Sequence, residues 1–163
     1  MKRDIRIYCD GASRKDGRGG WGFVVFEGVI ELYSGKGGEY DVTNNQMELE
    51  AAIRALRAAP RGRVNITMFL DSAYVVNGIT EHIDTWLRTN WRTSSNKPVK
   101  NVDRWMRLAE LDLQLQPVWQ HVKGHSGIYG NERADELATA GVPLEKKHEA
   151  PVLGRARHPR PRH

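Results

Sequence analysis

The segment 44–59 constrains the fold more than any other part of the sequence, because it has the pattern of a single amphipathic helix. Leu49, Ile53 and Leu56 recur at the spacing of one buried helical face. The apolar run that follows, VNITMFLDS, predicts a strand that ends at Asp71. A strand, a helix of about four turns and another strand form a parallel crossover unit. We therefore predict that the later strand lies beside the first strand of the chain.

Three strands are predicted before this helix. The stretch IRIYCD alternates between two faces and ends at Asp10-Gly11, a second strand lies near 21–27, and a third ends at Gly35. Their short connections predict an antiparallel meander. The rest of the chain predicts short helices at 72–79 and 81–89, a helix at about 101–112, a strand at 117–122, and a last helix that is capped by Asn131 and ends near Gly141. The fold class is therefore α/β with a mixed sheet.

Composition limits the class of protein and its compartment. The chain has 163 residues, 39% of them hydrophobic and 28% charged, which is ordinary for one globular domain. With Cys9 as the single cysteine, no internal disulfide can form, so we expect a reducing compartment, the cytoplasm. The start of the chain lacks the apolar run of a signal peptide, and no stretch approaches the roughly 20 apolar residues of a membrane span. We predict a catalytic domain over 1–145 and a disordered tail over 146–163, rich in Pro, Arg and His.

The net charge of +5 is concentrated in two segments. Residues 146–163 hold six Lys/Arg and one acid, so the remaining chain has equal numbers of basic and acidic residues. Within that neutral part, residues 86–107 carry six bases against one acid. A basic segment beside an acidic site would suit a polyanion and a metal together.

Four acids occupy positions where they could converge. Asp10 and Asp71 end strands that should be parallel neighbours, which would place them side by side. Glu48 opens the crossover helix near the same edge, and Asp135 lies in the first turn of the predicted last helix. Four such carboxylates would repel one another unless cations cancel their charge. Mg²⁺ prefers carboxylate oxygens, and a pair of divalent ions suits the hydrolysis of a phosphodiester.

Each acid alone also has an ordinary structural explanation. An Asp before Gly usually forms a turn, and an acid in a first helical turn usually serves the helix dipole. The metal site therefore depends on all four acids occurring in the expected elements.

Five extended motifs resemble bacterial ribonuclease HI. They are YCDGA, TNNQMELEAAIRAL, FLDSAYVVNGIT, WRTSSNKPVKNVDRW and VKGHSGIYGNERADELA, in collinear order over residues 4–142. The resemblance implies the ribonuclease H-like fold: a five-stranded mixed sheet flanked by helices, with a basic protruding handle. It implies a monomeric endonuclease that cuts the RNA strand of RNA–DNA hybrids by two-metal-ion catalysis. Mg²⁺ is the implied cofactor, with Mn²⁺ as a possible substitute, and the products carry 5′-phosphate and 3′-hydroxyl ends.

The resemblance also implies roles for individual residues. Asp10, Glu48, Asp71 and Asp135 match the catalytic metal-binding acids, and His125 matches a mobile catalytic histidine that relays a proton or assists product release. The residues implied to contact the substrate are Gly11, Asn44 and Asn45 in the minor groove, Trp86, Lys97 and Lys100 in the handle, and Thr43 and Asn101 at a DNA phosphate. Of the other handle tryptophans, we expect Trp105 to serve mainly for packing.

Four positions depart from the family pattern: Asp16, Asp41, Ala73 and His82. Asp16 and Asp41 put acids near the expected DNA phosphate, which predicts weaker or differently distributed binding. The basic tail could partly compensate for this, or it could be an inert solubilising tail; both explanations stay open.

Two other functions are consistent with much of this pattern. The same fold carries transposases, integrases and junction resolvases, although those enzymes are not expected to combine TNNQMELE with this handle. A hybrid-binding module with an inactive site is the other alternative, and the four acids together with His125 argue against it.

Overall fold

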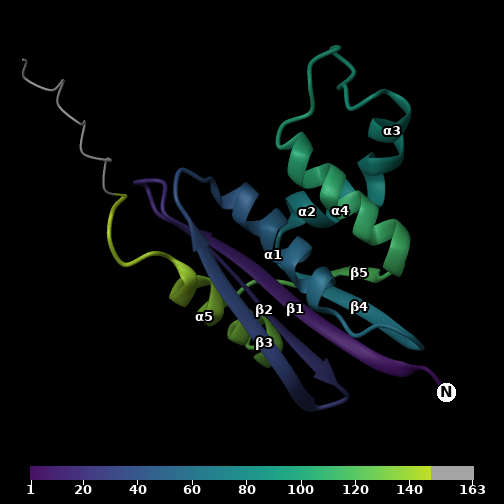
Figure 1. The fold of residues 1–163 in the computed structure, drawn as a ribbon, viewed down its shortest axis with the longest axis vertical. Coiled ribbons are helices and arrows are strands. Elements are labelled where there is room, and N and C mark those ends of the chain that lie inside the picture. Colours follow the sequence, from purple (N-terminus) through teal and green to yellow (C-terminus); the bar gives the residue numbers. More distant parts are fainter. Residues whose placement is uncertain (148–163) are drawn as a thin grey trace, which may run out of the picture.

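The computed structural model describes residues 1–147 and contains one sheet with helices on both of its faces (Figure 1). The strands are β1 (Arg3–Ser13), β2 (Gly19–Glu27), β3 (Ile30–Glu39), β4 (Val64–Leu70) and β5 (Val118–His121). The helices are α1 (Asn44–Ala58), α2 (Ala73–Asn77), the π-helical turn η1 (Gly78–His82), α3 (Ile83–Arg88), α4 (Val102–Leu115) and α5 (Tyr129–Gly141).

The sheet has the strand order β3-β2-β1-β4-β5. The antiparallel meander of β1, β2 and β3 is confirmed, as is the parallel placement of β4 beside β1 across the α1 crossover. A short β5 then pairs in parallel with β4 at the edge. The predicted five-stranded mixed sheet of the α/β class is therefore correct.

The two faces of the sheet are buried by different helices. Ile5 and Ile7 of β1 pack with the apolar stripe of α1, where Leu49 and Ile53 are inaccessible to solvent. On the opposite face, Leu137 of α5 packs in a smaller apolar cluster with residues of β2. Figure 1 shows α1 and α4 on one side of the sheet and α5 on the other. Both faces of the central strands are thus covered by helices.

The prediction that β1 ends at Asp10 is wrong, and β3 likewise continues past Gly35 to Glu39. Pairing with β2 carries β1 on to Ser13, opposite Gly19. The parallel pairing with β4 ends earlier, at Tyr8. Asp10 is therefore inside β1 and not at its end. It lies two residues beyond the part of β1 that pairs with β4.

The last helix also differs from its prediction. It begins at Tyr129, so Asn131 is a buried residue inside the helix and does not cap it, and Asp135 lies in the second turn. The predicted helices at 72–79 and 81–89 form one helical path interrupted by the η1 turn. Asn131 has the residue type of a cap, but α5 begins two residues earlier, after Ile128, which makes no side-chain capping bond.

Of the predicted tail, Lys146 and Lys147 are described, and the rest of 146–163 lies outside the described residues. None of the helices within residues 1–147 has both the length and the apolar composition needed to cross a bilayer.

Candidate active site

Three of the four predicted acids converge at one end of the sheet. One carboxylate oxygen from each of Asp10, Glu48 and Asp71 lies within 4.8 Å of the others. Asp10 comes from β1, Glu48 from the first turns of α1, and Asp71 directly follows β4. The crossover topology brings these elements together, because Asp10 and Asp71 both lie just beyond the parallel pairing of β1 with β4, which ends at Tyr8 and Phe69.

A glycine next to Asp10 allows α1 to approach this closely. A Cβ atom at Gly11 would lie 2.4 Å from the backbone nitrogen of Glu48 and 2.5 Å from the carbonyl carbon of Met47. Any side chain at position 11 would therefore push the start of α1 away from β1. Gly11 thus sets the separation of the Asp10 and Glu48 carboxylates, in addition to the minor-groove role expected for it.

None of the three clustered carboxylates forms an ion pair with a Lys or Arg side chain within residues 1–147. Burial raises the pKa of Asp10 to about 8, and the negative charge of Asp71 adds to the rise. Burial, followed by the charges of Asp10 and Asp71, raises the pKa of Glu48 well above its ordinary range. The Oε2 atom of Glu48 is buried and lacks a hydrogen-bond partner within residues 1–147. An orphaned buried acceptor among repelling acids is the arrangement expected of a ligand set for a divalent cation.

The loop after β5 passes close to this cluster. The Nε2 atom of His121 lies 3.0 Å from the carbonyl oxygen of Asp71. A Cβ atom at Gly124 would be 3.1 Å from Oδ2 of Asp71. His125 follows directly and is exposed, with a left-handed backbone at φ 54°. Its imidazole is therefore carried by a loop that passes close to one of the acids.

Asp135 is half-buried on α5 and lies outside the three-carboxylate cluster. It lies in the second turn of α5, and α5 packs against β1, the strand that carries Asp10, and against β2. Its predicted role as a fourth ligand remains a prediction.

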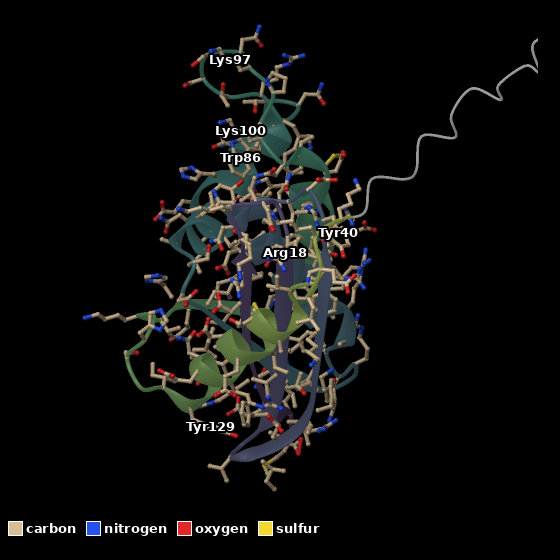
Figure 2. The ribbon with its side chains drawn as sticks, turned by 90° about the vertical axis from the view of Figure 1, so that its left-hand side faces the viewer. Arg18, Tyr40, Trp86, Lys97, Lys100 and Tyr129 are labelled. Atoms are coloured by element: carbon tan, nitrogen blue, oxygen red, sulfur yellow. The ribbon has the colours of Figure 1, made fainter. Side chains whose placement is uncertain are left out.

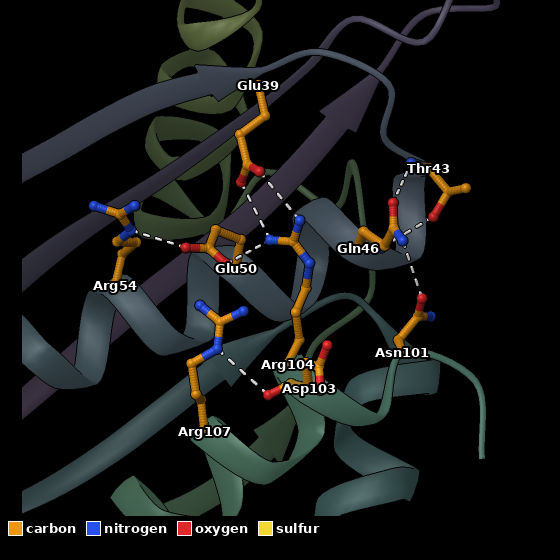
Figure 3. A network of polar contacts seen from close by, with 9 residues as sticks. All are labelled: Glu39, Thr43, Gln46, Glu50, Arg54, Asn101, Asp103, Arg104 and Arg107. Atoms are coloured by element: carbon orange, nitrogen blue, oxygen red, sulfur yellow. Dashed lines mark hydrogen bonds and ion pairs between the residues drawn. The ribbon is translucent and has the colours of Figure 1, made fainter. Parts of the chain in front are cut away.

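A second polar group lies at the start of α1 (Figure 3). Thr43 caps the helix and forms a capping box with Gln46, whose side chain also bonds to Asn101. The two residues predicted to hold a DNA phosphate, Thr43 and Asn101, are therefore brought to the same place by Gln46. Asn44 and Asn45 follow Thr43 and are both exposed.

The handle lies away from the acids. Trp86, Lys97 and Lys100 gather at the same end of the molecule in Figure 2, and both lysines are exposed. Trp86 is half-buried, with its ring 5.2 Å from that of Trp105 and 5.6 Å from that of His82. Trp105 is 1% exposed and packs in the core, so one face of this aromatic cluster is structural. On its other side His82 is exposed, and Trp86 is partly accessible to solvent.

An ion-pair network between α1 and α4 was not predicted from the sequence (Figure 3). Glu50 accepts hydrogen bonds from Arg54, at 2.9 Å, and from Arg104 of α4. Arg104 also forms a two-pronged pair with Glu39 at the end of β3. The i, i+4 spacing of Glu50 and Arg54 was a signal in the sequence. The pairing with Arg104 had none, because it depends on how α4 packs on α1.

Comparison with known proteins identifies the family. The RNase H family model matches residues 2–143. "Ribonuclease HI" of Pseudomonas aeruginosa is 49% identical over 144 residues, covering 86% of this chain and 95% of that protein. "Ribonuclease H" of Methylobacillus flagellatus is 51% identical over 141 residues, covering 85% and 91%. The chain belongs to the ribonuclease H family.

Solved structures agree with this assignment at the level of fold. A type 1 RNase H described as having "the type 2 active-site motif", LC9-RNase H1, superposes with a TM-score of 0.76 at 25% identity, covering 87% of this chain and 73% of that one. LC11-RNase H1, solved "in complex with RNA/DNA hybrid", gives a TM-score of 0.64 at 22% identity, covering 85% and 96%. The chain is thus an enzyme of the ribonuclease H class, with an acidic triad able to bind metal.

Proposed function

We propose that this ribonuclease H cuts the RNA strand of RNA–DNA hybrids, with Asp10, Glu48, Asp71 and Asp135 as metal-binding acids. The observation that carries the proposal is the cluster of three carboxylates, together with the buried Oε2 atom of Glu48, which has no hydrogen-bond partner within residues 1–147. Relatives of similar length that are about half identical carry the name ribonuclease H, and a structural neighbour was solved with an RNA/DNA hybrid.

The donor set fits hard divalent cations. All three clustered ligands are carboxylates, which Mg²⁺ prefers and which Mn²⁺ also accepts. Two such ions, when bound, would activate a water molecule and stabilise the leaving oxygen of the phosphodiester, giving 5′-phosphate and 3′-hydroxyl ends. Asp10, Glu48 and Asp71 would hold them, and Asp135 would complete the set from α5.

The residues around the acids would position the substrate. Gly11 would face the minor groove through its backbone, since the space that a side chain would need there is taken by α1. Asn44 and Asn45 are exposed beside the acids, and their amides can both donate to and accept from base edges and the 2′-hydroxyl. Since DNA lacks that hydroxyl, contacts at this point would select the RNA strand.

His125 would act at the leaving group. Its loop touches Asp71, and an imidazole can accept or donate a proton near neutral pH. We assign it proton relay or assistance to product release, because an exposed loop position can approach and withdraw from the phosphate without disturbing the sheet.

The DNA strand would run from the start of α1 towards the handle. Thr43 and Asn101 would bind a phosphate of this strand, while Trp86 would pack on deoxyribose. Lys97 and Lys100 would add phosphate contacts whose strength falls with salt. Asp41, one of the acidic departures, pairs with Lys147, which neutralises part of its repulsion towards the strand. We further propose that the enzyme is a cytoplasmic monomer.

One experiment tests this function directly. A labelled RNA is offered paired with DNA, paired with RNA, and single-stranded, to the wild type and to Asp10→Asn, with Mg²⁺ or with EDTA. Cleavage of the hybrid alone, only with metal and only by the wild type, is the expected result. If both proteins bind the hybrid and neither cleaves it, the protein is a hybrid-binding module and not a nuclease.

A further inference from the structure

Gln46 lies between two parts of the proposed nucleic-acid surface, and the chemistry of its bonds fixes how they are oriented (Figure 3). Its Oε1 atom accepts from the backbone nitrogen of Thr43 at 3.0 Å. Its Nε2 atom donates to Oδ1 of Asn101 at 3.2 Å. The side chain thus joins the start of α1 to the residue that precedes α4, 55 positions along the chain.

The direction of this chain of bonds follows from its first donor. A backbone N–H can only donate, so it requires an oxygen from Gln46. The amide nitrogen of Gln46 must then face Asn101, which requires the Asn101 oxygen on that side. The amide nitrogen of Asn101 is left to face the hydroxyl of Tyr74, at 3.1 Å. One backbone group therefore determines the orientation of two side-chain amides.

Tyr74 alone would not determine this orientation. Its hydroxyl also accepts from Nε1 of Trp105 at 3.0 Å, and its own hydrogen could serve an oxygen of Asn101 equally well. Without Gln46, Asn101 could turn its amide over at little cost. On the side of Tyr74, Asn101 would then present its amide oxygen instead of its amide nitrogen.

Two donors remain after all these bonds are counted. Thr43 accepts at Oγ1 from the nitrogen of Gln46, and no acceptor for its hydroxyl hydrogen is found among the described residues. The amide nitrogen of Asn101 carries two hydrogens, of which Tyr74 takes one. Both residues reach solvent, and Thr43 is the N-cap of the 15-residue helix α1, whose end favours anions. The Thr43 hydroxyl and the Asn101 amide, on either side of Gln46, therefore each have one hydrogen available to donate.

We propose that Gln46 is a positioning residue that holds Asn101 in the donor orientation, so that Asn101 and Thr43 bind the same phosphate of the DNA strand. This inference rests on the proposed function and adds a determinant of substrate affinity to it. The backbone of Asn101 is left-handed, at φ 60°, a conformation that asparagine tolerates better than most residues, and it aims the side chain into this junction.

Two substitutions separate the link from the helix cap. Gln46→Glu keeps an oxygen for the backbone of Thr43, since Glu serves a capping box as well as Gln, but it has no donor for Asn101. Gln46→Met is neutral and loses both bonds. Gln114→Glu, on an exposed position of α4, is the control for the added charge. We expect both changes at position 46 to raise KM for the hybrid about tenfold, a loss typical of a charge-assisted hydrogen bond, with kcat within about twofold.

The deciding measurement replaces the phosphates of the DNA strand one at a time by uncharged methylphosphonates. In the wild type and in Gln114→Glu, one position should raise KM markedly. In both variants at position 46, that same position should have little effect, a coupling that a merely structural role of Gln46 would not produce. The proposal is overturned if both variants retain the wild-type sensitivity, or if no single phosphate responds in the wild type. In either case hybrid cleavage would persist, whereas failure of the proposed function would abolish cleavage by the wild type itself.

Discussion

Glu48 and Glu50 are two residues apart on α1, and both are buried, at 5% and 2% exposure, but their surroundings are opposite. Burial acts to raise the pKa of Glu50, and the hydrogen bond and charge of Arg54 with the charge of Arg104 outweigh it, so this pKa lies below its ordinary value. At Glu48, burial and the charges of Asp10 and Asp71 outweigh a backbone hydrogen bond from Gly11, and the pKa lies well above the ordinary range.

The difference separates a carboxylate that the protein neutralises itself from one that we propose to bind a cation. At Glu50 the chain supplies its own countercharge from α1 and α4. At Glu48 it supplies more negative charge, and one oxygen has no hydrogen-bond partner within residues 1–147. A buried, uncompensated acid costs stability, and sites of this kind cluster where proteins do chemistry. The comparison therefore predicts that the two positions respond to substitution in opposite ways.

The largest expected effect is on activity. Glu48→Gln removes a charged ligand while nearly preserving shape, and we expect kcat to fall by roughly 10²–10³-fold, the size of losing one strong electrostatic contact in a transition state. Glu50→Gln should keep kcat within a few-fold, because Glu50 faces the arginines. Initial rates on a labelled RNA–DNA hybrid check both variants. Equal losses at the two positions would contradict the distinction.

Much of this site could be predicted from the sequence, because three of its acids lie on neighbouring elements of one crossover unit. Alternation in β1 and the stripe of α1 fixed which strands would be neighbours, and that placed Asp10, Glu48 and Asp71 together. The exact end of β1 could not be predicted, since it depends on pairing with β2 and not on local turn chemistry. The position of Asp135 within α5 was missed for a related reason: Asn131 has the residue type of a cap but lies buried inside the helix.

Contacts between distant helices were the least predictable part. Arg104 and Glu50 are 54 residues apart, and Gln46 and Asn101 are 55 apart. Neither pair has a spacing rule, because the packing of α4 on α1 depends on side-chain shapes throughout the core. The capping box of Thr43 and Gln46 joins residues three apart, whereas the bond of Gln46 to Asn101 depends on the tertiary fold.

The next effect is on stability, and it tests whether the ion pairs of Glu50 stabilise the fold. Arg104→Met should lower the free energy of unfolding by about 2–3 kcal/mol, because it leaves a buried carboxylate with Arg54 as its only cation within the described residues. Combining it with Glu50→Gln should recover part of that loss, since the uncompensated charge is then gone. Urea unfolding of the two single variants and the double variant measures this coupling. Strictly additive losses would mean that the pair is not coupled.

At the acidic cluster, the free energy of unfolding should depend on pH with the sign opposite to that expected from Glu50, whose pKa is lowered. The folded protein holds a proton on Asp10 up to about pH 8, while the ordinary value for this acid is 3.8. Between these limits the folded state binds more protons than the unfolded chain, so the metal-free protein should lose stability as pH rises through that window. Asp10→Asn should flatten this dependence. Urea midpoints in EDTA at about pH 5 and about pH 8 test it, and a wild type that gains stability towards the higher pH would refute it.

The smallest expected effect is stabilisation by metal, which distinguishes the two carboxylates without any substrate. Mg²⁺ at about ten times its Kd should stabilise the folded protein by about 1.4 kcal/mol, which for a domain of this size raises Tm by roughly 3–5 °C. Glu50→Gln should show the same rise from its own starting Tm, while Glu48→Gln should show little. The rise should also be larger at about pH 8 than at about pH 5.5, because protons compete with the metal for the carboxylates. Thermal unfolding with and without Mg²⁺ at both pH values provides the measurement. A rise that survives in Glu48→Gln would place the cation elsewhere and remove the reason for treating Glu48 differently from Glu50.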